Sequence, residues 1–94
     1  MPTIESRLNP RDAAFEANSR LMESLVADLR ARIDHIALGG GEVARKKHTA
    51  RGKLLPRDRV RMLCDPGAPF LELSQLAAYD MYRNDASSAG IITG

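Results

Sequence analysis

The sequence contains few of the residues that build a large compact core. Aromatic residues make up 4% of its 94 residues, there is no Trp, and the only aromatic side chains are Phe15, Phe70, Tyr79 and Tyr82. Aromatic side chains contribute much of the buried area in most cores. A chain of this length also leaves a large share of its surface exposed when it folds alone. We therefore do not expect one large core from these residues.

The sequence also lacks local patterns of catalytic and metal-binding residues. Cys64 is the only cysteine, which excludes an internal disulfide, and its neighbours at 61–63 favour a buried structural thiol. No His or second Cys stands at ligand spacing from it, so neither a nucleophile nor a metal site is expected. The run at 39–41 is three glycines without the Gly-Lys-Ser or Gly-Lys-Thr of a phosphate loop, and it indicates a helix stop and a linker.

Neither charge nor hydropathy points to nucleic acid or to a membrane. The 14 basic and 12 acidic residues give a formal net charge of +2, which is close to balance. No apolar run is long enough for a signal peptide or a transmembrane helix. Glu5 near the start disfavours a mitochondrial presequence. These observations predict a cytoplasmic protein.

A long amphipathic helix is the main predicted element. Residues 1–8 show no period and predict an extended or disordered arm. Asn9 and Pro10 then provide a helix start signal, and a helix is expected over 12–38. One stripe of apolar residues runs along it at Phe15, Met22, Val26, Leu29, Ile33 and Ile36. Packing on the outside of a larger protein is favoured over a free coiled-coil dimer, because no heptad is sustained.

Two shorter helices and two strands are predicted after the glycines. The helices are expected at 42–50, stopped by Arg51 and Gly52, and at 56–65, begun by a proline. Apolar strands are expected at 69–73, with Glu72 facing outward, and at 90–94.

The segments between and after these strands are less regular. Residues 74–82 are ambiguous between a strand continuation and an irregular segment, and 83–88 read as a polar loop. The strand at 90–94 has no return partner in the sequence, so we expect the chain to be part of a longer protein.

A dense basic block lies over the two shorter helices. Between residues 45 and 61 there are eight cations and one acid, Asp58; the cations are Arg45, Lys46, Lys47, Arg51, Lys53, Arg57, Arg59 and Arg61. Such a block can bind the phosphates of a nucleotide-like cofactor. It can equally be a solvated face that pairs with acids of a partner. Nucleic acid is disfavoured because no aromatic residues are interleaved. His35 and His48 are interpreted as packed or solvated side chains rather than general bases.

Several ordered motifs carry a resemblance to a known family. They are His-Thr-Ala-Arg-Gly-Lys-Leu-Leu-Pro-Arg-Asp-Arg-Val at 48–60, Leu-Cys-Asp-Pro-Gly-Ala-Pro-Phe-Leu-Glu-Leu at 63–73, Ala-Ala-Tyr at 77–79 and Ala-Gly-Ile-Ile-Thr-Gly at 89–94. This order closely resembles the start of the β subunits of biotin-dependent acyl-CoA carboxylases. Within this family the sequence looks most like the methylcrotonoyl-CoA carboxylase branch. Three motifs carry that likeness: Pro-Phe-Leu-Glu-Leu-Ser at 69–74, Met-Tyr at 81–82 and Ala-Gly-Ile-Ile-Thr-Gly at 89–94. Cys64 stands where the family more often has Leu, and Ser87-Ser88 where Pro is common.

The resemblance implies an α/β enzyme subunit. It implies N-terminal helices that lead into the first strands of a crotonase-like carboxyltransferase domain, with the part seen here mostly α. Residues 1–40 would be an arm and amphipathic helix, and residues 41–94 the incomplete start of the acyl-CoA carboxyltransferase N-terminal domain. The implied reaction transfers CO2 from carboxybiotin to 3-methylcrotonoyl-CoA in leucine breakdown. Alternatives are a propionyl-CoA or geranyl-CoA carboxylase β subunit and, in another class, a non-catalytic helical interaction module.

The resemblance also implies partners and one candidate site. Biotin would be carried on a separate α subunit, other β subunits would form a hexameric core, and no metal, nucleic acid or membrane partner is implied. In the family the oxyanion-binding segments lie downstream, so no catalytic residue is assigned. CoA carries three phosphate groups, and we expect Arg45, Lys47, Arg51 and Lys53 to contribute to binding them, because these cations meet at one glycine-jointed corner.

Overall fold

The chain is mostly helical. A computed structural model describes residues 1–94. It contains three α-helices, α1 (Ala13–Ala37), α2 (Glu42–Ala50) and α3 (Pro56–Leu63), and two 3-10 turns, η1 (Tyr82–Asn84) and η2 (Ser87–Gly90). The chain divides into two compact units, Met1–Ala31 and Arg32–Gly94. The expectation of a mostly α chain is therefore confirmed.

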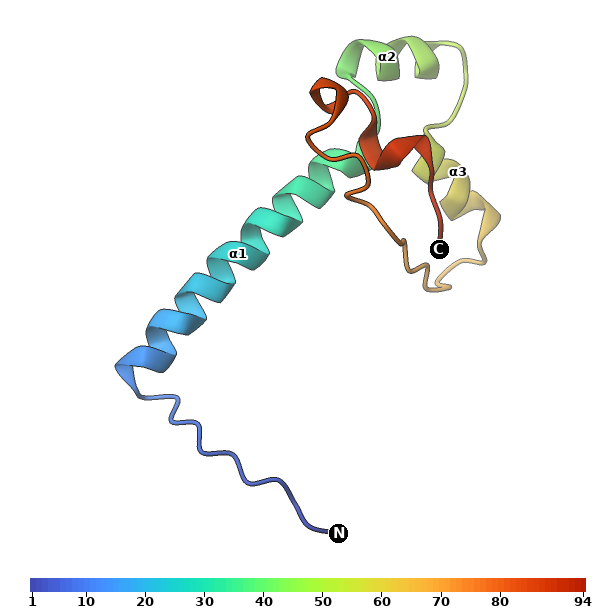
Figure 1. Ribbon diagram of the computed structural model, residues 1–94. Helices are drawn as coiled ribbons and strands as arrows, with labels where there is room; N and C mark the ends of the chain where they lie inside the picture. Colours follow the sequence, from blue (N-terminus) through green and yellow to red (C-terminus); the bar gives the residue numbers. More distant parts are fainter. The chain divides into compact units, whose positions relative to one another are not determined.

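The long helix α1 forms where the sequence predicts it, beginning at Ala13 against an expected start at residue 12, but Asn9 is not its capping residue. Figure 1 shows it as one uninterrupted helix. Asn9 does not cap it; its Oδ1 accepts a hydrogen bond from the backbone N–H of Arg11, 3.1 Å away, in a turn before the helix. The carbonyl of Asp12 accepts the first helical bond, from Glu16 N–H at 3.0 Å. Asp12 therefore marks the helix start, where its negative charge suits the helix dipole.

The apolar stripe of α1 remains largely exposed to solvent. Met22 is 59% exposed and Leu29 42%, and Leu25 beside the stripe is 56% exposed, whereas Ile36 near the end of the helix is 6% exposed. Within a protein, an amphipathic helix gains most of its stability from the packing of its apolar face against another surface. This face is therefore available for another surface.

The two short helices follow the local signals closely. Helix α2 has the predicted bounds, and Gly52 after it adopts a left-handed φ of +72°, which glycine tolerates without strain. Helix α3 begins at Pro56 as expected, since its missing N–H costs nothing in the first turn. It ends at Leu63 rather than Asp65, because Cys64 is already extended with ψ of 151°.

The two predicted strands are not formed. A single antiparallel bridge joins Leu73 to Thr93. In it the Leu73 N–H donates to the Thr93 carbonyl at 2.7 Å, and the Thr93 hydroxyl donates to the Leu73 carbonyl at 3.4 Å. Both bridged residues lie in segments predicted as strands, but the expectation that residues 90–94 have no partner in the sequence was wrong, since Thr93 pairs with Leu73. One bridge does not make a ladder. An isolated pair of short strands is marginally stable at best in water, and these residues offer each strand only one partner.

The segment between the two bridged residues is irregular and turns repeatedly through left-handed conformations. Eight non-glycine residues have positive φ, all between +50° and +61°: Ser74, Ala78, Asp80, Tyr82, Arg83, Asn84, Ser88 and Ala89. Each such residue costs about 1–2 kcal/mol in local backbone preference. Of the two alternatives that the sequence left open for residues 74–82, the irregular segment is the one observed.

The interior of the chain is very small. Ile36 and Ser88 are its only buried residues, at 6% and 5% exposure, and no side chain is fully buried. The scarcity of aromatic residues predicted such a limited core. The buried serine instead marks a polar network.

Candidate functional site

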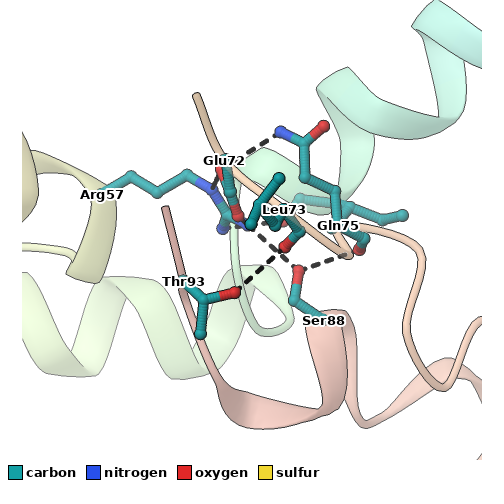
Figure 2. A network of polar contacts seen from close by, with 7 residues as sticks. Arg57, Glu72, Leu73, Gln75, Ser88 and Thr93 are labelled. Atoms are coloured by element: carbon teal, nitrogen blue, oxygen red, sulfur yellow. Dashed lines mark hydrogen bonds and ion pairs between the residues drawn. The ribbon is translucent and has the colours of Figure 1, made fainter. Parts of the chain in front are cut away.

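Arg57 is the centre of a polar network within residues 32–94, which Figure 2 shows from close by. Its position in the first turn of α3 lets the guanidinium reach three separate segments. Nε and one terminal nitrogen of Arg57 donate to the two carboxylate oxygens of Glu72, at 3.0 and 2.5 Å. Further bonds run to the Ser88 hydroxyl at 3.1 Å and to the Ile36 carbonyl at 3.4 Å. One side chain thus connects the end of α1, α3 and the irregular segment.

The network is shielded and internally satisfied. The side chains of Arg57 and Glu72 are 15% and 11% exposed. Gln75 donates from Nε2 to Glu72 at 3.1 Å, and Ser88 donates from its hydroxyl to the Gln75 carbonyl at 3.0 Å. No buried side-chain nitrogen or oxygen lacks a partner. The expectation that Glu72 faces outward was wrong, because a partner 15 residues earlier holds it inward.

The Arg57 bonds lower the pKa of Glu72. Hydrogen bonding from the guanidinium stabilises the carboxylate and is the main cause. Burial opposes it, while the Gln75 amide and the positive charge of Arg57 add to the lowering. Glu72 is therefore held as a carboxylate in a structural role, and the ion pair leaves no free base for chemistry.

The basic block divides into paired and unpaired cations. Arg57 pairs with Glu72, Lys46 with Glu42 at 2.6 Å, and Arg61 with Asp58 at 2.9 Å. The latter two pairs are exposed and contribute little to stability. The exposed cations outside these pairs are Lys47, Arg51, Lys53 and Arg59.

The four candidate phosphate-binding residues do not form one uniform cluster. Lys47 and Arg51 are four residues apart, Arg51 being the C-cap of α2, so they share a face. Lys53 follows one residue after the left-handed Gly52 and is exposed. Arg45 is two residues from Lys47, a spacing that turns it to another side of α2. There it donates to the Gly40 carbonyl at 2.6 Å.

His48 is a neighbour in sequence of Lys47, Arg51 and Lys53, which we call the basic corner, and it has a definite hydrogen-bond partner. His48 Nε2 donates to the Leu54 carbonyl at 2.8 Å, and the imidazole is half-buried. This agrees with the interpretation of His48 as a packed side chain. Sequence reasoning missed the carbonyl partner, because nothing in the residue spacing identifies which carbonyl a histidine will meet.

The structure shows no arrangement of residues for a metal site or a membrane-spanning helix. No group of three His, Cys, Asp or Glu side chains lies close enough to hold a metal ion. Cys64 is free and half-buried. No helix has the length and apolar character needed to cross a membrane.

Comparison with known proteins identifies the family. No family model matches the sequence. A methylcrotonoyl-CoA carboxylase beta chain, mitochondrial, of Arabidopsis thaliana is 51% identical over 81 residues, covering 86% of this chain and 14% of the relative. A probable methylcrotonoyl-CoA carboxylase beta chain, mitochondrial, of Drosophila melanogaster is 45% identical over 92 residues, 97% of this chain and 16% of the relative. A biotin-dependent 3-methylcrotonyl-coenzyme A carboxylase beta1 subunit of Mycobacterium tuberculosis is 60% identical over 70 residues, which cover 74% of this chain and 13% of the relative.

These similarities cover most of the chain at high identity. The chain belongs to the family of biotin-dependent acyl-CoA carboxylase β subunits. The three relatives named above carry the methylcrotonyl designation, which agrees with the branch indicated by the motifs at 69–74 and 89–94. The chain spans about one sixth of the length of these relatives or less.

The expectation of a cytoplasmic location was wrong. The plant and fly relatives are named mitochondrial proteins, and the mycobacterial relative is also close. The expectation depended on a missing apolar run and on Glu5, and neither of these is a positive signal for any compartment.

Proposed function

We propose that the chain is the N-terminal part of a carboxyltransferase subunit that transfers CO2 from carboxybiotin to 3-methylcrotonoyl-CoA, in leucine breakdown. The observation that carries this proposal is the similarity to β chains of methylcrotonoyl-CoA carboxylases along nearly the whole chain. In the whole subunit the acyl-CoA is activated as its enolate within a crotonase-like fold. Backbone N–H groups outside these residues stabilise the developing oxyanions.

We assign biotin to a separate α subunit and no step of the transfer to these residues.

The chain contributes to assembly through its first part and to substrate binding through its second. We assign residues 1–40 to an arm and docking helix, and residues 41–94 to the start of the carboxyltransferase N-terminal domain. The exposed apolar face of α1 supports the first assignment, because such a face needs a covering surface. In the complete enzyme the partners are the biotin-carrying α subunit and further β subunits in a hexameric core.

The exposed basic corner contributes to binding the phosphates of CoA. Lys47 and Arg51 share a face, Lys53 lies beyond Gly52, and all three are exposed without an ion-pair partner. Cations of this kind attract phosphate oxygens through charge-assisted hydrogen bonds. Arg45 has a lesser part, because its guanidinium also binds Gly40.

Replacing Arg51 and Lys53 together by Ala in the complete β subunit tests this assignment. We expect the KM for 3-methylcrotonoyl-CoA to rise about ten-fold while kcat and the biotin carboxylase activity of the α subunit stay unchanged, since binding contacts equal in ground and transition state affect KM alone. Lys46→Ala is the matched control: it removes an exposed cation from the same helix, but one that already pairs with Glu42.

Calorimetry with CoA fragments gives a second measurement. The double variant should weaken binding of CoA to the β subunit and leave binding of pantetheine, which lacks the phosphates, unaffected. An unchanged KM, or equal losses in the double variant and in Lys46→Ala, would remove Arg51 and Lys53 from the CoA site. The family membership of the chain would stand in either case.

A further inference from the structure

We infer that His48 is a positioning residue for the basic corner: its bond to the Leu54 carbonyl holds the loop that carries Arg51 and Lys53. The loop is residues 51–53, which follow the end of α2 at Ala50 and lie between the bonded pair. The inference rests on the proposed CoA site and adds to it a residue that bears no contact with substrate.

The chemistry of the bond fixes the role of the imidazole. A carbonyl oxygen only accepts, so Nε2 of His48 carries the hydrogen and donates it across 2.8 Å. The bond joins the last turn of α2 to the N-cap side of α3, six residues later. Because Nε2 points at Leu54, that nitrogen is not available to a phosphate oxygen.

The loop between these ends is already tightly wound. The Arg51 N–H donates to the His48 carbonyl at 3.3 Å, and the Gly52 N–H to the Thr49 carbonyl at 2.9 Å. Gly52 reverses the chain with its left-handed φ of +72°, and a Cβ there would meet no atom within 4 Å. The backbone conformation rather than crowding thus requires glycine.

The loop nevertheless lacks apolar support. Arg51, Gly52 and Lys53 are all exposed, so no packed side chain fixes the path from α2 to α3. The His48 bond is the one side-chain hydrogen bond that spans the whole loop. Without it the loop ends can separate, and the two cations lose a fixed spacing. Ordering them on binding would then weaken affinity.

Substitutions at His48 in the complete β subunit distinguish positioning from direct contact. His48→Ala should raise the KM for acyl-CoA about five-fold with kcat unchanged, an effect equivalent to about 1 kcal/mol of binding. Gln places an amide nitrogen near the position of Nε2 and can donate to Leu54, so His48→Gln should restore most of the affinity. Asn is too short to reach, and His48→Asn should behave like Ala.

Combining His48→Ala with the Arg51/Lys53 double substitution completes the test. If His48 acts through the two cations, it should have no further effect once they are gone, and the effects should be strongly non-additive. A full additional five-fold loss in that background, or failure of Gln to restore binding, would overturn the positioning role. If the double substitution raises KM and His48→Ala does not, the CoA site stands and this inference falls. If the double substitution itself has no effect, the proposed site falls first.

Discussion

Neutralising Glu72 should loosen the whole unit formed by residues 32–94. Glu72→Gln preserves the shape of the side chain but removes the charge that pairs with Arg57. One of its terminal atoms then becomes an N–H₂ group that faces the guanidinium donors. Arg57 remains charged and 15% exposed, so it loses its partner without regaining full hydration.

The expected cost follows from the depth of the pair. Removing one partner of a fully buried ion pair costs about 3–5 kcal/mol, whereas exposed pairs contribute about 0–1 kcal/mol. Glu72 is 11% exposed and its pair with Arg57 is bidentate, which places it near the buried limit. The Gln retains one acceptor, so we expect about 2–3 kcal/mol. This is a large share of the stability of a chain with two buried residues.

Amide hydrogen exchange measures the effect locally. The Leu73 amide, bonded to Thr93, and the Ala89 amide, bonded to Ala77, report on the two ends of the irregular segment. Their protection in Glu72→Gln should fall roughly 30- to 140-fold, since 1.4 kcal/mol is a factor of ten. Asp58→Asn is the matched control, because it breaks the exposed Arg61 pair on the same helix. Equal protection in the two variants would refute the reasoning.

Two further predictions concern pH and the apolar face of α1. Because the pKa of Glu72 is lower in the folded than in the unfolded chain, the unfolded chain binds more protons as the pH falls. Protection of the Leu73 amide should therefore hold above about pH 5 and decline below about pH 4.3, the pKa of an unperturbed glutamate. In Glu72→Gln this pH dependence should be lost. A Glu72→Gln chain with the same acid decline would contradict it. Leu29→Glu should lower the melting temperature of the complete β subunit, whereas Ser24→Glu, on the opposite side of α1, should not, because Leu29 lies on the apolar stripe and Ser24 does not. Equal melting temperatures for the two variants would show that nothing covers the stripe.

The helices could be predicted because their signals are local. The bounds of α2 and the start of α3 follow from residues within a few positions, namely Glu42, Gly52 and Pro56. The start of α1 was predicted to within one residue, but its capping residue was not, because two competing signals, Asn9 and Asp12, stand three residues apart and either can accept early backbone bonds.

The polar network could not be predicted, because its partners are distant in sequence. Arg57 was one of eight similar cations, and no local pattern distinguishes the one that meets Glu72 from those that face solvent. Glu72 alternates with apolar neighbours, which in a two-sided strand would point it outward. No strand formed, so the alternation did not apply.

The polar network around Arg57 explains how so small a core holds a defined arrangement. Hydrophobic burial is non-directional and would tolerate several packings of such a short segment. The Arg57 fork accepts only one geometry, because Glu72, Ser88 and the Ile36 carbonyl must all lie within bonding distance at once. The left-handed backbone at Ser88 is conformationally unfavourable, and the hydrogen bonds of its hydroxyl with Arg57 and Gln75 offset this cost in free energy. Leu63 and Leu71, at 87% and 77% exposure, take no part in this arrangement. We therefore expect the polar network to set the conformation before the rest of the subunit covers these apolar side chains.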